Sequence, residues 1–187
     1  MTGPGRPAGP AADTEALVLT AALDLLLSEG ATALTPQRLH SITGVARTTI
    51  YRHWPTPREV LAALIAVAPH RPSEPSGDLA ADLHAEVDLL CDRLRDKPVA
   101  AFLRALVMAS SGDSGYAELR RRYVMDLLEP FRAAVRALDI GDESYAEDAA
   151  ASIASPLLVD VLLLDRPVAR ARAHRAVDDL LAKTTAP

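Results

Sequence analysis

The stretch Leu34–Glu59, LTPQRLHSITGVARTTIYRHWPTPRE, decides the fold of this 187-residue chain. It predicts two short helices joined by a tight turn and followed directly by a third helix. Thr35 suits the N-cap position, and Pro36 suits the first helical position, where a missing N–H costs nothing. Gly44 then breaks the helix, because glycine readily adopts the left-handed conformation of a sharp corner.

Apolar residues at helical spacing give this stretch an inner face. Leu39 and Ile42 are three residues apart, so we expect both to turn inward, with Val45 filling the corner. The second helix, from Arg47 to about His53, then turns Ile50 inward. Such an arrangement is a helix-turn-helix, whose second helix is free to enter the major groove of DNA.

The outward face of the second helix suits DNA, because Ala46–Arg58 contains three arginines and no acidic residue. Arg47 is expected either to read guanine through two hydrogen bonds or to bind a phosphate. Thr48 is expected to touch a base edge or a thymine methyl group. The full set of DNA-binding candidates is Thr35, Gln37, Arg47, Thr48, Thr49, Tyr51, Arg52, His53 and Arg58.

The third helix begins with a capping box, in which Thr56 is the N-cap and Glu59 is the third helical residue. Its unbonded N–H groups, together with Arg58, form an expected phosphate site. The alternative is an ordinary helical hairpin whose polar face is solvated. The acid-free face and the two capped helices favour DNA binding over that alternative.

The residues that carry a family resemblance are Val18, Ala21, Ala22, Leu25, Gly30, Leu34, Thr35, Leu39, Gly44, Val45, Thr48–Arg52 and Trp54–Thr56. Together they resemble the DNA-binding domain of the TetR family of bacterial repressors, over about residues 13–65. The resemblance implies an all-α homodimer with an N-terminal helix-turn-helix and a larger ligand-binding domain. It also implies that Arg47, Thr48 and Tyr51 occupy base-reading positions, and Thr49 and His53 phosphate positions.

Three residues depart from the family pattern. Ala46 replaces a Ser or Thr, so the second helix lacks a side-chain cap, at a cost of about 1 kcal/mol. His40 replaces a small Ala between the two helices and is expected to loosen or re-aim their packing. Pro57 replaces a basic residue, for which Arg58 substitutes one position later.

Composition supports an all-α chain and excludes several other classes. Apolar residues make up 49% and aromatic residues 4%, so the core must be filled by Leu, Ala and Val, of which Leu and Ala favour helices. The net charge of -5 argues against a general nucleic-acid coat protein, but not against a reader with one basic face. A lone cysteine, Cys91, and the lack of a signal peptide or an 18-residue apolar run fit a cytoplasmic protein without membrane contact.

No catalytic, metal or cofactor site is predicted. The five histidines include no pair spaced four apart, and no P-loop, nucleophile elbow or HExxH motif occurs. We therefore expect neither an enzyme nor a cofactor.

The chain divides into four predicted parts with about nine helices in all. Residues 1–12 form a flexible arm, residues 13–68 the helix-turn-helix domain and residues 69–77 a Pro-rich connector. Residues 78–187 form a helical domain for ligand binding and dimerisation. In that domain, the apolar stretch Ile153–Leu164 and the helix Val168–Leu181 are expected to pair across a twofold axis.

The middle helices supply the candidate ligand-binding residues Phe102, Tyr116, Tyr123 and Phe131. Each of these also suits an ordinary core, but a buried tyrosine hydroxyl needs a partner that a ligand can supply. The expected ligand is small and mostly apolar.

The sequence thus predicts a dimeric, sequence-specific DNA-binding transcriptional regulator. It is expected to act as a repressor that binds a pseudo-palindromic operator and is released by a small molecule. The alternative is a helical ligand-binding or scaffold protein whose helix-turn-helix no longer reads DNA, for which His40 and Ala46 are the best support.

Overall fold

The computed structural model describes residues 12–67, 73–74, 76–109, 114–139 and 141–184. Within these ranges the chain is all-α, with nine α-helices, one short 3-10 helix and no strand, as predicted. Residues 1–11 of the predicted arm and residues 68–72 and 75, in and beside the predicted connector, lie outside the described part.

The chain forms two compact units, of which the first comprises residues 1–69 and 105–116. Its elements are α1 (Ala12–Glu29), η1 (Ala31–Ala33), α2 (Pro36–Thr43), α3 (Arg47–His53) and α4 (Pro57–Ala66). The α1 helix packs against both α2 and α4, and α2 packs against α3. The fully buried side chains of this unit include Val18, Ala22, Leu34, Leu39, Ile50, Val60 and Leu61.

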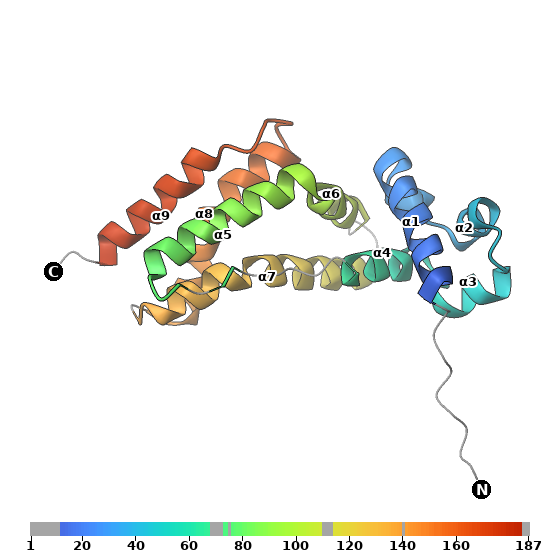
Figure 1. The fold of residues 1–187 in the computed structure, drawn as a ribbon, viewed down its shortest axis with the longest axis horizontal. Coiled ribbons are helices and arrows are strands. Elements are labelled where there is room, and N and C mark those ends of the chain that lie inside the picture. The colour runs from blue at the N-terminus through green and yellow to red at the C-terminus, as the bar shows by residue number, and fades with distance from the viewer. Residues whose placement is uncertain (1–11, 68–72, 75, 110–113, 140, 185–187) are drawn as a thin grey trace, which may run out of the picture. The chain divides into compact units, whose positions relative to one another are not determined.

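The second unit comprises residues 70–104 and 117–187. Its elements are α5 (Leu79–Asp96), the first part of α6 (Val99–Ala109), most of α7 (Ser114–Ala137), α8 (Glu143–Leu162) and α9 (Arg170–Thr184). The α9 helix lies along both α5 and α8 (Figure 1). Leu90, Phe131, Ile153, Leu157 and Val177 are fully buried at the centre of this core.

The predicted helices Arg47 to about His53 and Val168–Leu181 agree with α3 and α9 to within a few residues. Side-chain caps begin two other helices of the second unit, since Asp78 accepts hydrogen bonds from the N–H groups of Ala80 and Ala81 and Asp142 accepts one from Tyr145. The functional division of the chain at residues 69–77 stays a prediction. Within the described ranges, no helix is both long enough and apolar enough to cross a membrane.

Candidate nucleic-acid interface

The first helix of the helix-turn-helix begins and ends as predicted. The hydroxyl oxygen of Thr35 accepts a hydrogen bond of 3.2 Å from the N–H of Arg38, with Pro36 in the first turn. Gly44 ends the helix in the left-handed conformation, with φ 70° and ψ 0°. Its N–H donates to the carbonyl oxygen of His40 over 2.9 Å. A residue with a side chain would be strained at this φ.

Two side chains of α2 close the turn. The Nδ1 atom of His40 lies 2.8 Å from the carbonyl oxygen of Val45. Because a carbonyl oxygen only accepts, Nδ1 of His40 must carry a proton. The Thr43 hydroxyl donates to the carbonyl of Leu39 over 2.6 Å and accepts from the N–H of Val45 over 3.3 Å. His40, a departure from the TetR pattern, therefore forms a hydrogen bond across the turn.

One packing prediction for α2 is wrong. Leu39 is fully buried, whereas Ile42 is 53% exposed. Residues three apart differ by about 60° around a helix, and α2 ends one residue after Ile42, at Thr43. No described residue of the first unit therefore buries that last position, and Pro36 and Leu39 are the residues that bury α2.

The α3 helix presents most of its predicted DNA-binding side chains to solvent. Ile50 is fully buried, which fixes the orientation of the helix. Of the predicted residues, Arg47, Thr48, Tyr51 and Arg52 are exposed, while Thr49 and His53 are half-buried. The guanidinium carbon of Arg47 lies 5.7 Å from the ring centroid of Tyr51, one turn along the helix, which is within cation–π range. Arg47 and Tyr51, two of the three base-reading candidates, thus share one face of α3.

His53 is less accessible than the other candidates on α3. Its ring lies 5.7 Å from that of the buried Trp54, at an angle of 55°. The Nε2 atom of His53 is buried and forms no hydrogen bond to any described residue. That nitrogen is consequently not presented to solvent.

The start of α4 confirms the predicted capping box. The N–H of Thr56 donates to Glu59 Oε2 over 2.9 Å, and the N–H of Glu59 donates to the Thr56 hydroxyl over 3.4 Å. Arg58 is half-buried, and its side chain lies against Gly115. A Cβ atom at Gly115 would lie only 1.9 Å from Nη1 of Arg58. Arg58 thus lies against the first turn of α7.

The other two candidates lie on α2 and at its start. The hydroxyl of Thr35 is engaged in the cap, and Gln37 is exposed. The neighbouring Arg38 forms an ion pair of 2.5 Å with Glu29 of α1, which neutralises that cation. Gln37 and the exposed side chains of α3 are therefore the best-presented candidates.

The structure brings together two of the four ligand-binding candidates. The rings of Phe102 and Tyr123 meet edge to face, with centroids 6.2 Å apart and an interplanar angle of 85°. Burial raises the pKa of Tyr123 to about 12, and the nearby Arg93 opposes the shift. The Tyr123 hydroxyl is therefore a neutral donor at any physiological pH.

The remaining ligand-binding candidates are placed differently. Phe131 is fully buried in the core of the second unit, whereas Tyr116 belongs to the first unit. Two of the surface pockets of the second unit are lined by described residues. The smaller, of about 250 Å³, is lined by Cys91, Leu94, Arg95, Val161, Arg166, Pro167, Val168 and Arg170. The larger, of about 650 Å³, is lined by Gly77, Asp78, Leu79, Ala80, Leu138, Leu181 and Ala182. None of the four candidates lines either pocket.

Solved structures with the same helix arrangement cover nearly the whole chain. The TetR family transcription regulator SCO0332 aligns with a TM-score of 0.67 and 25% identity, over 94% of this chain and 100% of that chain. The fold of this chain is the one found in TetR family transcription regulators. A TetR transcriptional regulator from Agrobacterium tumefaciens aligns with a TM-score of 0.73 and 24% identity, over 92% of this chain and 94% of that one.

A third neighbour by fold is the flavonoid-responsive regulator FrrA. It aligns with a TM-score of 0.71 and 17% identity, over 93% of this chain and 96% of that chain. No protein-family model and no curated protein matches the sequence.

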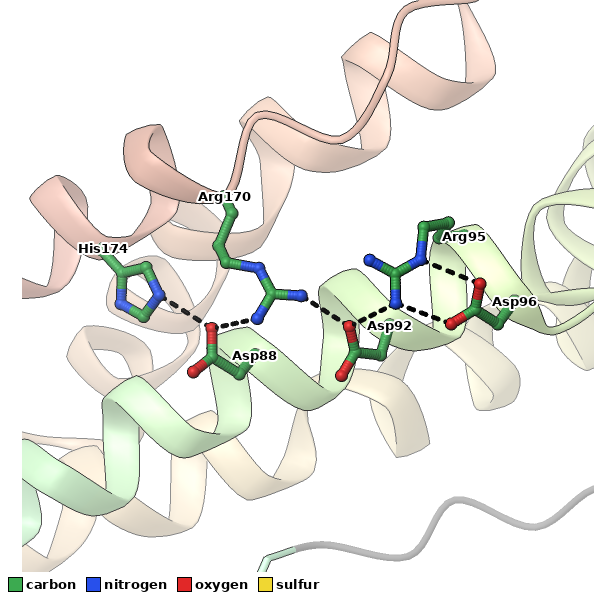
Figure 2. Close-up of polar contacts among 6 residues, drawn as sticks. All are labelled: Asp88, Asp92, Arg95, Asp96, Arg170 and His174. Atoms are coloured by element: carbon green, nitrogen blue, oxygen red, sulfur yellow. Dashed lines mark hydrogen bonds and ion pairs between the residues drawn. The ribbon is translucent and has the colours of Figure 1, made fainter.

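Sequence reasoning missed the polar contact between α5 and α9 (Figure 2). On α5 the contact residues His84, Asp88 and Asp92 are spaced four apart, and on α9 so are Arg170, His174 and Asp178. This four-residue spacing of polar residues was visible in the sequence of each helix. It indicates a polar face, because residues four apart lie on one side of a helix.

Proposed function

We propose that this TetR-type chain is a dimeric transcription regulator that binds a pseudo-palindromic operator through α3. The observation that carries the proposal is the outer face of α3, where Arg47, Thr48, Tyr51 and Arg52 are exposed. No acidic residue lies on this helix. Arginine and threonine supply both base-edge and phosphate contacts in a major groove.

The rigidity of the turn supports the same proposal. Reading a base edge requires a recognition helix held at a fixed angle to the rest of the domain. The buried Ile50 and the bond from His40 to Val45 both restrict α3. The departures at His40 and Ala46 therefore leave the element intact, which argues against a helix-turn-helix that has lost its role.

Exposed apolar side chains at the end of α8 support dimerisation. Val159 is 41% exposed, and Leu163 and Leu164, which follow it, are 74% and 46% exposed. A second copy of the chain is the natural cover, because pairing of α8 and α9 across a twofold axis buries this patch in both copies. The same symmetry sets two recognition helices about one DNA turn apart.

Release by a small ligand is the third element of the proposal. Its support is the aromatic contact between Phe102 and Tyr123 within the helical unit, together with the similarity to FrrA, which is named flavonoid-responsive. Suppose that a ligand binds the form of the protein that does not fit the operator about 1–3 kcal/mol more tightly than the form that does. Such a ligand weakens operator binding about 5- to 150-fold. By reciprocity, the operator weakens ligand binding by the same factor.

An electrophoretic shift against the DNA upstream of the chain's own gene tests the proposal. We expect binding at low salt that weakens as salt rises, because phosphate contacts release counterions. Arg47→Ala is expected to cost about 1–3 kcal/mol and to relax the preference at one base position. The matched control is Arg122→Ala, which removes an exposed arginine from α7 and should leave binding unchanged.

Two other outcomes have distinct meanings. An equal loss of affinity on specific and random DNA would assign Arg47 to a phosphate. Absence of binding to any genomic fragment at low salt would refute the proposal and favour a helical scaffold or ligand-binding protein.

A further inference from the structure

Two histidines from distant parts of the sequence meet between α5 and α9. The Nδ1 atoms of His84 and His174 are 2.7 Å apart, and the ring centroids are 4.9 Å apart. These two distances require the rings to meet nearly end-on at their Nδ1 atoms. Such an alignment is that of an N–H···N hydrogen bond at the short end of the usual range.

The opposite nitrogen of each ring faces a carboxylate. Nε2 of His84 lies 3.1 Å from Asp178 of α9, and Nε2 of His174 lies 2.9 Å from Asp88 of α5. An ionised carboxylate only accepts hydrogen bonds, so Nε2 of His174, which is hydrogen-bonded to Asp88, carries a proton. An ion pair between His84 and Asp178 requires a proton on Nε2 of His84 as well. The four side chains thus form a line from Asp178 through His84 and His174 to Asp88.

The line fixes the number of protons on the two rings. With both Nε2 atoms protonated, the contact between the Nδ1 atoms needs one more proton, which makes three in total and one positive charge on the pair. Without it, two lone pairs face each other at 2.7 Å, or one ring changes tautomer and loses its carboxylate. With a fourth proton, two N–H groups and two cations are in contact.

The distance between the Nδ1 atoms also decides between a proton and a metal ion. Metal–nitrogen bonds of about 2.0–2.1 Å leave no room for an ion on the line between two nitrogens that are 2.7 Å apart. A proton is the species that fits.

The surrounding charges favour one positive charge on the pair. Besides His174, Asp88 binds Arg170 over 2.7 Å, and Arg170 also binds Asp92 over 2.5 Å (Figure 2). Burial opposes ionisation of Asp88, but the hydrogen bonds from His174 and Arg170 hold its pKa below the ordinary value.

The third helix packed here, α8, turns Asp160 toward α9, where it binds Arg172 over 2.9 Å. The charged partners of the two rings are therefore Asp178 on one side and Asp88, shared with Arg170, on the other.

We propose that His84 and His174 form a proton-binding latch, which holds α9 on α5 when the two rings share a single proton. The latch lies within the second unit and does not depend on the proposed binding of DNA. It makes the attachment of α9 sensitive to pH on both sides of an optimum.

The optimum follows from counting protons. Near pH 6.5 the two histidines of an unfolded chain together carry one proton more than two neutral rings. The latch in the folded state carries the same number. Above that pH the folded state holds more protons than the unfolded state, so stability falls as pH rises. Below it the unfolded state holds more, so stability falls as pH falls. The folding equilibrium constant changes by up to about tenfold per pH unit on either side.

Chemical denaturation between pH 5 and pH 9 tests the latch in the full chain. The variants are His84→Gln, His174→Gln and the double variant, with Arg175→Gln, on the exposed side of α9, as a control. The two single variants and the double variant give the coupling free energy between the two histidines. We expect this coupling free energy to be largest near pH 6.5 and to fall at lower and at higher pH. The Arg175→Gln control should keep the wild-type dependence of stability on pH. A coupling independent of pH would overturn the proposal, as would no coupling at all.

Nuclear magnetic resonance of histidine-labelled protein gives a second, structural readout. We expect scalar coupling between the two Nδ1 atoms through one bridging proton near pH 6.5, lost in either single variant. If each ring instead takes up its proton as it does in the variant lacking the other histidine, the rings share none and the latch does not exist.

Discussion

The imidazole of His40 on α2 binds the main-chain carbonyl oxygen of Val45 over 2.8 Å and closes the turn that leads into α3. We expect His40→Ala to lower the free energy of unfolding of the first unit by about 0.5–1.5 kcal/mol, the usual net value of one such bond. Operator affinity should fall as well, because α3 loses a constraint. Chemical denaturation and DNA titration measure the two effects. Ser41→Ala, at an exposed neighbour, is the control, and a His40→Ala protein as stable as wild type would show that the bond contributes nothing.

The missing cap of α3 can be restored. Ala46 has φ −52° and ψ 134°, a conformation that suits an N-cap, but it has no side-chain oxygen. Ala46→Ser is expected to raise the free energy of unfolding by about 0.5–1 kcal/mol, and Thr56→Ala to lower it by about 1 kcal/mol. Ala46→Val, which adds bulk without an acceptor, should give no gain. Equal stability of the Ser and Val variants would rule out capping as the cause.

Gly115 and Arg58 are predicted to act as one unit. A methyl group at Gly115 would lie 1.9 Å from Nη1 of Arg58, so Gly115→Ala must displace that side chain. Because the displaced atoms are the far end of a flexible side chain, we expect little loss of stability but an altered affinity for DNA. The effect of Gly115→Ala should largely vanish in an Arg58→Ala background, since neighbours in contact are not additive. If the effects of the two substitutions on DNA affinity are fully additive, the two residues act independently and the prediction is wrong.

Dimerisation can be tested without disturbing the core of the protomer. Leu158 and Val161 pack partly against that core, whereas Val159 is 41% exposed. Val159→Glu is expected to give a folded monomer, because a charge placed in an apolar interface has no partner. Light scattering at micromolar concentration gives the mass. The matched control is Val107→Glu on α6, at a residue 48% exposed, and a monomeric wild-type protein would refute the proposed dimer.

Tyr123 makes stability depend on pH in the alkaline range. Its pKa is raised to about 12 by burial, with Arg93 opposing, while an unfolded tyrosine titrates near 10. Between those values the folded state holds the proton that the unfolded state has lost, so stability falls as pH rises. We expect wild type to lose about 1–3 kcal/mol more than Tyr123→Phe between pH 10 and pH 12. Parallel curves for the two proteins would contradict a buried hydroxyl.

The sequence by itself determined the helix-turn-helix and its caps. Thr35, Gly44 and Thr56 act on backbone groups within three or four residues, so their roles can be read without knowing the fold. The exposed face of α3 was equally legible, since one buried residue, Ile50, fixes which side of a seven-residue helix is outside.

Only the tertiary structure decided the contacts between distant segments. The exposure of Ile42 depends on what lies beyond the end of α2, and the contact of Arg58 with Gly115 joins residues far apart in the chain. His84 and His174 are separated by 90 positions. Their spacing to Asp88 and Asp178 shows that each helix has a polar face, but it does not show which other helix packs against that face. The packing of α9 onto α5 brings the two polar faces together, because helical periodicity identifies a face and never its partner.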